Sequence, residues 1–176
     1  MSCLLIIDSS VLIELIELNL LHLLAFYLDL KDAVLVVPSK VYNEVLSGNR
    51  SSILSKQLPT RLRIISSSLE GLKRLRRRHL QLGDGELEVI ALAIELGKAK
   101  NMEIIALIDE KKARRIVADV YRIEVHGTLW LIVEFKRKRL IDGETALNIL
   151  KKILIHGFYL SENLLSKAVE IFEKDC

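Results

Sequence analysis

Short, uninterrupted apolar runs recur along the chain, separated by segments in which apolar residues are spaced differently. The first run, residues 3–7 (CLLII), ends abruptly at Asp8. Continuous runs of this length are typical of strands that are buried on both faces of a sheet. By the same criterion we predict strands at residues 33–38 and 103–109. Residues 62–67 and 122–127 are predicted as two more strands. Residues 49–52 (NRSS) are predicted to form a loop.

The segments between these runs carry apolar residues at helical intervals. The strongest example is 83–100, which begins with turn residues and ends with basic ones. Other helices are predicted at residues 10–18, 20–28, 39–48, 69–80, 110–120, 128–140, 143–155 and 161–174. Alternating strands and helices predict a three-layer α/β/α fold, in which helices cover both faces of a central parallel sheet of four or five strands. The last two helices are additional to this fold.

The composition fits a single packed domain of 176 residues. Because 51% of the residues are apolar and only 5% are aromatic, the core has to be built from aliphatic side chains. The window most like a membrane span, residues 11–30, is interrupted at helical intervals by Glu14, Glu17, His22 and Asp29. The chain also begins without the pattern of a secretory signal. We therefore expect a soluble, cytoplasmic protein with no membrane partner.

Positive charge is concentrated in three segments, although the formal net charge is only +3. The segments are LKRLRRRHL (72–80), EKKARR (110–115) and EFKRKRL (134–140). A single basic run is often only the solvated face of a helix. Three such runs in one small domain favour a polyanionic partner.

Two aspartates directly follow predicted strands. Asp8 ends the first apolar run, and Asp109 ends the run that begins at residue 103. Ligand sites in open parallel sheets lie beyond the carboxyl ends of the strands, so the two carboxylates are candidates for a shared site. Aspartate is also a favoured helix N-cap, and capping is the alternative role for each of them.

Two glutamates lie on apolar faces of predicted helices. Glu44 lies beside Val45 on the apolar side of its helix, and Glu86 lies on the apolar stripe of the helix at 83–100. We therefore expect both side chains to point inward and Glu88 to be more exposed. The alternative for Glu86 is a capping box at the start of its helix.

Four carboxylates gathered at one sheet edge would repel one another unless a cation offset their charge. The four candidates are Asp8, Glu44, Glu86 and Asp109. Because they offer only oxygen donors, Mg²⁺ or Mn²⁺ is favoured over Zn²⁺. Ser10 could hold a metal-bound water, or it could be an ordinary residue of the first helical turn.

Four segments resemble, in order, the successive motifs of PIN-domain nucleases. They are IIDSSVLIEL (6–15), VPSKVYNEVL (37–46), LGDGELEVIALAIELG (82–97) and ALIDEKKARRIVADVYRIEVHGT (106–128). The resemblance covers about residues 1–135 and is closest to a prokaryotic branch related to the toxin ribonucleases of toxin–antitoxin pairs. HGFYLSENLL (156–165) also resembles the C-terminal segment of that branch.

This resemblance implies a PIN-like nuclease domain over residues 1–140 and a helical extension over residues 141–176 that packs on the same domain. The implied activity is hydrolysis of phosphodiester bonds in single-stranded or looped RNA with Mg²⁺ or Mn²⁺. Arg114 and Arg115 are candidate RNA contacts because they follow Asp109 closely, although a solvated helix face is the alternative for both. A homodimer and an antitoxin partner also fit the resemblance.

By the same resemblance, the four candidate carboxylates occupy the acidic positions of the family. Two departures bear on the metal geometry. The third acid, Glu86, is a glutamate where many relatives have aspartate, and Glu88 or Asp84 could take its role. The second acid of the Asp-Asp pair common in this branch is Glu110.

Two other functions are compatible with parts of this pattern. A PIN-like scaffold that binds RNA or a protein without cutting would keep the fold but would not need the acids. A small-molecule phosphatase with an aspartyl nucleophile would need a second aspartate two residues after Asp8, where Ser10 stands. The intact set of acids favours the nuclease.

Overall fold

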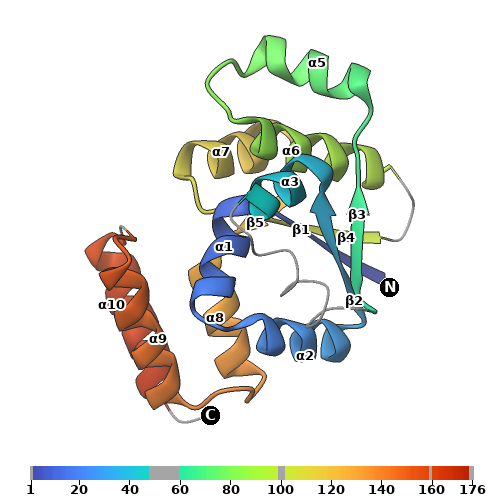
Figure 1. Ribbon diagram of the computed structural model, residues 1–176. Coiled ribbons are helices and arrows are strands. Elements are labelled where there is room, and N and C mark those ends of the chain that lie inside the picture. The colour runs from blue at the N-terminus through green and yellow to red at the C-terminus, as the bar shows by residue number, and fades with distance from the viewer. Residues whose placement is uncertain (1, 48–59, 99–101, 159, 175–176) are drawn as a thin grey trace.

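A parallel sheet of five strands forms the centre of the molecule (Figure 1). The computed structural model describes residues 2–47, 60–98, 102–158 and 160–174, so the loop predicted at 49–52 lies outside the described residues. The strands are β1 (Ser2–Ile7), β2 (Ala33–Pro38), β3 (Leu62–Ile65), β4 (Met102–Leu107) and β5 (Glu124–His126). Their order across the sheet is β3-β2-β1-β4-β5, and every neighbouring pair is parallel.

Helices cover both faces of this sheet. They are α1 (Ser9–Glu17), α2 (Leu21–Lys31), α3 (Ser39–Ser47), α5 (Leu69–Arg78), α6 (Asp84–Leu96), α7 (Lys111–Arg115) and α8 (Thr128–Arg137). Figure 1 shows α6 above the sheet, α2 and α8 below it, and α5 farther out beyond α6. The predicted three-layer α/β/α architecture is therefore confirmed.

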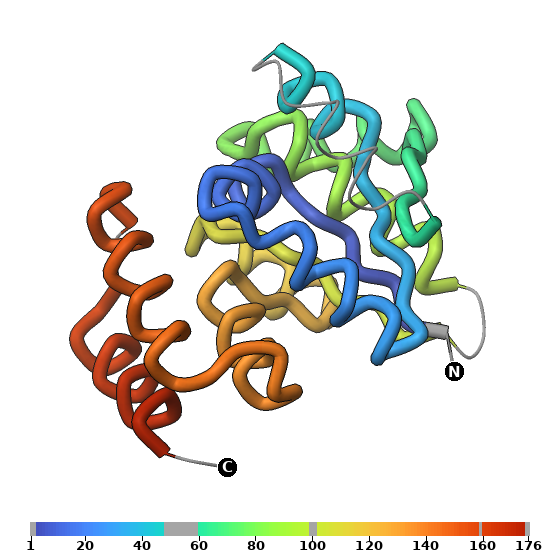
Figure 2. Tube along the Cα trace, turned by 60° about the horizontal axis from the view of Figure 1, so that its bottom comes forward, coloured from blue at the N-terminus to red at the C-terminus, as the bar shows by residue number. Residues whose placement is uncertain are grey.

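Two more helices, α9 (Gly143–Ile155) and α10 (Glu162–Glu173), follow the sheet domain. Figure 2 shows them side by side at the edge of the molecule. Their buried residues, among them Ile153 and Phe172, belong to the same apolar cluster as the core of the sheet domain, and both helices contact α8. The boundary predicted at residue 140 stays a prediction.

The central position of β1 explains why acids from distant parts of the chain meet. Its residues Leu5, Ile6 and Ile7 are each at most 1% exposed, as expected for a strand covered on both faces. Ile7 is in register with Leu107, and the backbone N–H of Asp8 donates to the Leu107 carbonyl at 2.9 Å. The carboxyl ends of β1 and β4 therefore lie together at one edge of the sheet.

The helix predicted at 110–120 differs most from the structure. It consists of one short α-helix, α7, followed directly by a π-helix over Ile116–Val120. The helix predicted at 83–100 ends at Leu96, and that predicted at 20–28 continues to Lys31 before Asp32 takes a left-handed conformation. Apolar periodicity marks where a helix is buried, and it does not mark where the backbone turns away.

In the part of the chain that the structure describes, no single helix is long and apolar enough to cross a membrane. Among the described helices, only α1 and α2 taken together reach that length and composition, and they meet at a bend of 118°.

Candidate active site

An acidic cavity of about 260 Å³ opens at the edge of the sheet where β1 ends. Its lining comes from the starts of α1, α6 and α7 and from the middle of α3. The lining residues are Asp8, Ser9, Ser10, Glu44, Gly83, Gly85, Glu86 and Glu110. Half of these residues are acids, and the described lining contains no basic side chain.

Asp8 both caps α1 and faces the cavity. Its Oδ2 atom accepts the backbone N–H of Ser10 at 3.3 Å and the Ser10 hydroxyl at 2.8 Å. These bonds leave Oδ1 facing Gly85. Asp8 therefore caps α1, as the alternative prediction held, and the capping bonds also hold its carboxylate at the cavity. Ser10 orients this carboxylate directly.

Gly85 brings the carboxylates of Asp8 and Glu44 close together. A Cβ atom at residue 85 would lie 3.2 Å from Asp8 Oδ1 and 3.3 Å from each carboxylate oxygen of Glu44. The missing side chain therefore leaves a small space bordered by oxygen donors from α1 and α3. Such a space, with oxygen donors alone around it, suits a hard divalent cation.

Glu44 is exposed, although we expected its side chain to point inward from the apolar side of its helix. The buried positions of α3 are Val41 and Val45. Glu44 lies at the edge of this buried face and reaches the cavity from the solvent side. Periodicity shows which side of the helix carries Glu44. It does not show whether the residue lies in the middle of the buried face or at its edge.

Glu86 also combines a local structural role with a place in the cavity. Its Oε2 atom accepts the backbone N–H of Gly83 at 2.8 Å, which is the capping bond considered as an alternative. Burial raises the pKa of Glu86, the Gly83 N–H lowers it, and the negative charges of Asp8, Glu110 and Glu44 raise it further. The other three acids are thus close enough to disfavour the ionisation of Glu86.

Glu88 is buried, contrary to the expectation that it would be more exposed than Glu86. It is 1% exposed, whereas Glu86 is half-buried. Its carboxylate accepts the backbone N–H of Lys40 at 2.6 Å, the hydroxyl of Ser39 at 3.0 Å and the backbone N–H of Ser67 at 3.3 Å. The expectation failed because α6 is buried on nearly all sides. A single apolar stripe therefore does not show which of its acids is more buried.

Asp84, the other alternative for the third acid, is turned away from the cavity. It forms ion pairs with Arg76 of α5 and with Lys40 of α3, the latter at 3.6 Å. Of the three candidates for the third acid, only Glu86 lines the cavity.

Asp109 lies near Asp8, but its carboxylate faces α8. Oδ1 accepts the backbone N–H of Thr128 at 2.8 Å, and Oδ2 accepts the Thr128 hydroxyl at 2.6 Å. Burial raises the pKa of Asp109, the bonds from Thr128 and the charge of Arg114 lower it, and the charge of Asp8 raises it again. Of the four acids expected in one site, Asp8, Glu44 and Glu86 line the cavity, and Asp109 is not among the lining residues.

Glu110 takes the place in the cavity that we expected for Asp109. It caps α7 by accepting the backbone N–H of Ala113 at 2.5 Å, and it lines the cavity. The sequence singled out Glu110 only as a departure from a family motif. Its position directly after Asp109, where the chain turns out of the sheet edge, was the signal available.

The two candidate RNA contacts on α7 differ in environment. Arg114 is partly buried and donates to the backbone carbonyls of Ile108 at 3.2 Å and Asp109 at 2.9 Å. Arg114 therefore stabilises the turn after β4. This role differs from both predicted alternatives, a solvated helix face and a contact with RNA phosphate. Arg115 is exposed.

Comparison with known families gives one clear match. The family model of the PIN domain matches residues 4–174, from β1 through α10. A search of curated proteins finds no match for the chain. The match includes the two C-terminal helices, which lie beyond most of the motifs that carried the resemblance.

Proposed function

The chain belongs to the PIN-domain family, and on that premise we propose that it is a metal-dependent endoribonuclease. PIN domains are generally nucleases and usually use divalent metals. The observation that carries the proposal is the cavity in which Asp8, Glu44 and Glu86 meet at the end of β1. A scaffold without catalytic activity would have no use for carboxylates gathered in one space, because their mutual repulsion opposes folding.

Asp8, Glu44 and Glu86 are the residues that would hold Mg²⁺ or Mn²⁺. Asp8 and Glu44 border the space beside Gly85, and Glu86 adds a third carboxylate from the first turn of the same helix. When bound there, a divalent cation lowers the pKa of a water molecule and stabilises negative charge on the phosphodiester. Ser10 keeps Asp8 oriented, and the Gly83 N–H does the same for Glu86.

Asp109 is proposed as a positioning residue. Its two bonds to Thr128 attach the end of β4 to the start of α8, next to Asp8. Asp109 lies close enough to Asp8 that the negative charge of Asp8 raises the pKa of Asp109. Removing the charge of Asp109 should weaken cation binding less than removing Asp8.

The proposed substrate is single-stranded or looped RNA, and α5 is the surface that we propose to contact its phosphates. The ion pair between Arg76 and Asp84 connects α5 to the start of α6, beside the cavity. The exposed cations of α5 are Lys73, Arg74, Arg76, Arg77 and Arg78. Lysine and arginine contacts to phosphate supply most of the sequence-independent affinity for nucleic acid. Arg115 of α7 is a further proposed contact, whereas Arg114 is engaged with the backbone of the turn.

The resemblance also leads us to propose a toxin-like role, in which a homodimer is held inactive by an antitoxin protein. The support is the motif order of the sequence alone. Induced expression tests this part, since a toxin-like nuclease arrests growth and Asp8→Asn relieves the arrest.

The test of the nuclease is a cleavage assay on a fluorescently labelled single-stranded RNA with Mg²⁺ or Mn²⁺. We expect cleavage that stops with EDTA and is lost in Asp8→Asn but retained in Glu162→Gln, an exposed acid at the start of α10. Cleavage that persists in EDTA, or that survives Asp8→Asn, would refute the metal mechanism. Binding of RNA without cleavage in every metal would identify a scaffold.

A further inference from the structure

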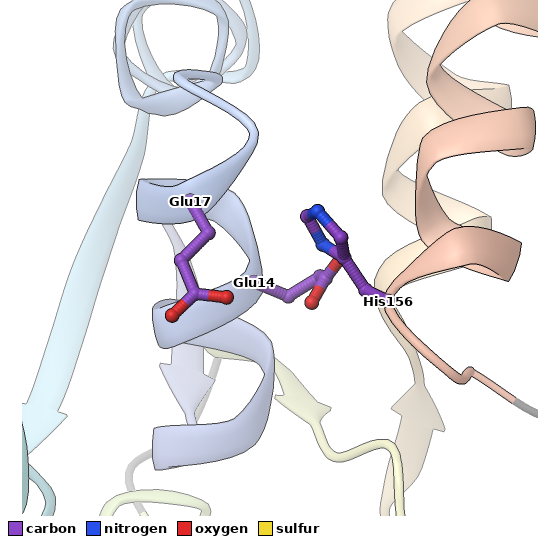
Figure 3. A group of neighbouring side chains, drawn as sticks. All are labelled: Glu14, Glu17 and His156. Atoms are coloured by element: carbon purple, nitrogen blue, oxygen red, sulfur yellow. The ribbon is translucent and has the colours of Figure 1, made fainter.

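A second group of metal-ligating side chains lies outside the acidic cavity. Glu14 and Glu17 belong to α1, and His156 directly follows the last residue of α9. One possible ligand atom from each of the three lies within 4.8 Å of the other two. Figure 3 shows the two glutamates projecting from one helix while His156 reaches toward them from the C-terminal helices.

The fold brings these residues together from opposite ends of the chain. Glu14 and Glu17 are three residues apart, so they share one face of α1. His156 lies 142 residues after Glu14, and its Nδ1 atom is 3.0 Å from Glu14 Oε1. Glu14 is buried, whereas Glu17 and His156 are exposed. The group therefore has one fixed side and one side open to solvent.

We propose that Glu14, Glu17 and His156 form a second metal site, selective for a transition-metal cation of the zinc class. One imidazole nitrogen and two carboxylates are three of the four ligands that zinc takes, and the open side leaves the fourth position to water. Neighbouring ligands in a tetrahedral zinc site are about 3.3 Å apart, given metal–ligand distances near 2 Å. Glu14 and His156 are 3.0 Å apart, close to that spacing, and a carboxylate oxygen of Glu17 lies within 4.8 Å of both.

The donor sets of the two sites select different cations. The acidic cavity offers oxygen atoms alone, which suits Mg²⁺ or Mn²⁺. The group at His156 adds an imidazole nitrogen, which favours zinc and neighbouring metals over Mg²⁺. Zinc should therefore bind at His156 even when Mg²⁺ is present in large excess.

A cation at this site would fasten the C-terminal helices to α1. One contact, between His156 Nδ1 and Glu14 Oε1 at 3.0 Å, already connects these two parts. Coordination by both would add a cross-link between the helix that begins at Asp8 and the end of α9. Binding to the folded state alone raises its stability by mass action, so metal should raise the melting temperature.

The test is a titration of the full chain with Zn²⁺ in millimolar Mg²⁺ at pH 7.5, followed by calorimetry and thermal melting. Wild type and Asp8→Asn should each bind one Zn²⁺ and melt at a higher temperature with it. His156→Gln and Glu17→Gln should bind Zn²⁺ at least about tenfold more weakly and lose the thermal shift. Matched controls are His22→Gln in α2 and Glu162→Gln in α10, both exposed, which should behave as wild type.

Two results would overturn the proposal. One is Zn²⁺ binding of unchanged affinity in both His156→Gln and Glu17→Gln. The other is Zn²⁺ binding that disappears in Asp8→Asn, which would assign the ion to the acidic cavity. Because Glu17 is exposed, Glu17→Gln should fold normally, and melting without metal checks this. Occupancy is measured by binding, so the result does not depend on whether the protein cuts RNA.

Discussion

The carboxylate of Glu88 accepts the backbone N–H of Lys40 at 2.6 Å, so a side chain of α6 caps the start of α3. The helix held in this way carries Glu44 into the acidic cavity. Glu86, two residues earlier, faces that cavity instead. Two acids of one helix thus have different surroundings: Glu88 holds the start of α3, and Glu86 lines the cavity.

Glu86→Gln and Glu88→Gln should therefore fail in different ways. Glu86→Gln should abolish most RNA cleavage with little change in stability, because a glutamine oxygen can still accept the Gly83 N–H. Glu88→Gln should lower the free energy of unfolding by about 1–3 kcal/mol. The NH2 group of glutamine would face the Ser67 N–H, so two hydrogen-bond donors would meet where the carboxylate now accepts. Cleavage rates and denaturant unfolding of both variants measure the difference. Equal losses of activity at equal stability would contradict this assignment.

Gly85→Ala should reduce cleavage by filling the space between Asp8 and Glu44. The new Cβ atom would lie 3.2–3.3 Å from their oxygens, so the carboxylates would have to move apart. Gly83→Ala is the matched control in the same turn, because its Cβ would lie 3.6 Å from Glu86 Oε2, an ordinary contact. We expect a higher Mn²⁺ requirement for cleavage in Gly85→Ala than in Gly83→Ala. The same Mn²⁺ requirement in both variants would remove Gly85 from the site.

Asp109→Asn should make the metal-free protein less sensitive to rising pH. Burial and the charge of Asp8 raise the pKa of Asp109 above its ordinary value of 3.8. The folded state therefore binds this proton more tightly than the unfolded chain does. The stability that it contributes is present below about pH 4 and is lost as the pH rises through the raised pKa. Asparagine can still bond to Thr128, so at pH 7 without metal the variant should melt at the same or a higher temperature.

Melting curves from pH 4 to pH 7 in EDTA measure this effect. Asp142 is the contrasting residue, because its bonds to Thr145 lower the pKa of its carboxyl group. Its contribution has the opposite sign and is lost as the pH falls. Added Mn²⁺ separates the roles of the acids, since Asp109→Asn should keep most of the thermal shift that Asp8→Asn loses. Loss of the shift in Asp109→Asn would make Asp109 a direct ligand.

Removing charge from α5 should weaken RNA binding without affecting the acidic cavity. Arg74→Gln and Arg77→Gln together should raise the Kd for single-stranded RNA. They should also reduce the slope of log Kd against log salt by about 0.7 for each phosphate that the protein no longer neutralises. Lys151→Gln and Lys152→Gln, on exposed positions of α9, are the matched control. Binding is measured in Asp8→Asn, which leaves the RNA intact. An equal effect of both pairs would show that only overall charge matters.

The fold was predictable from sequence because the strands that organise the sheet are continuous apolar runs. Residues 3–7 and 33–38 cover nearly all of β1 and β2, and Asp8 marks the carboxyl end of the central strand. The strand predicted at 122–127 contains β5, whereas the π-helix after α7 was not predicted, because its geometry depends on contacts with neighbouring elements. A continuous run of apolar residues indicates a strand that is buried on both faces of the sheet, as β1 is.

The site was predictable in part, since Asp8, Glu44 and Glu86 line one cavity. The directions of individual side chains were not. Glu88 is buried because backbone donors of α3 and of the segment before α5 meet it, and no local pattern shows those donors. Asp109 faces Thr128, which lies 19 residues away in the sequence.

The central place of β1 also decides when the acidic cavity can exist during synthesis. β1 pairs with β2 after about 30 residues, but its other partner, β4, is made only when residue 107 has left the ribosome. Until then one edge of β1 is open, and Asp8 lacks the backbone acceptor at Leu107. Pairing of strands far apart in the sequence is slow, because the chain loses the entropy of loop closure before the contacts between the strands stabilise it. A nascent chain therefore carries Asp8, Glu44 and Glu86 before it can bring them together, and the acidic cavity forms only when β4 has paired with β1.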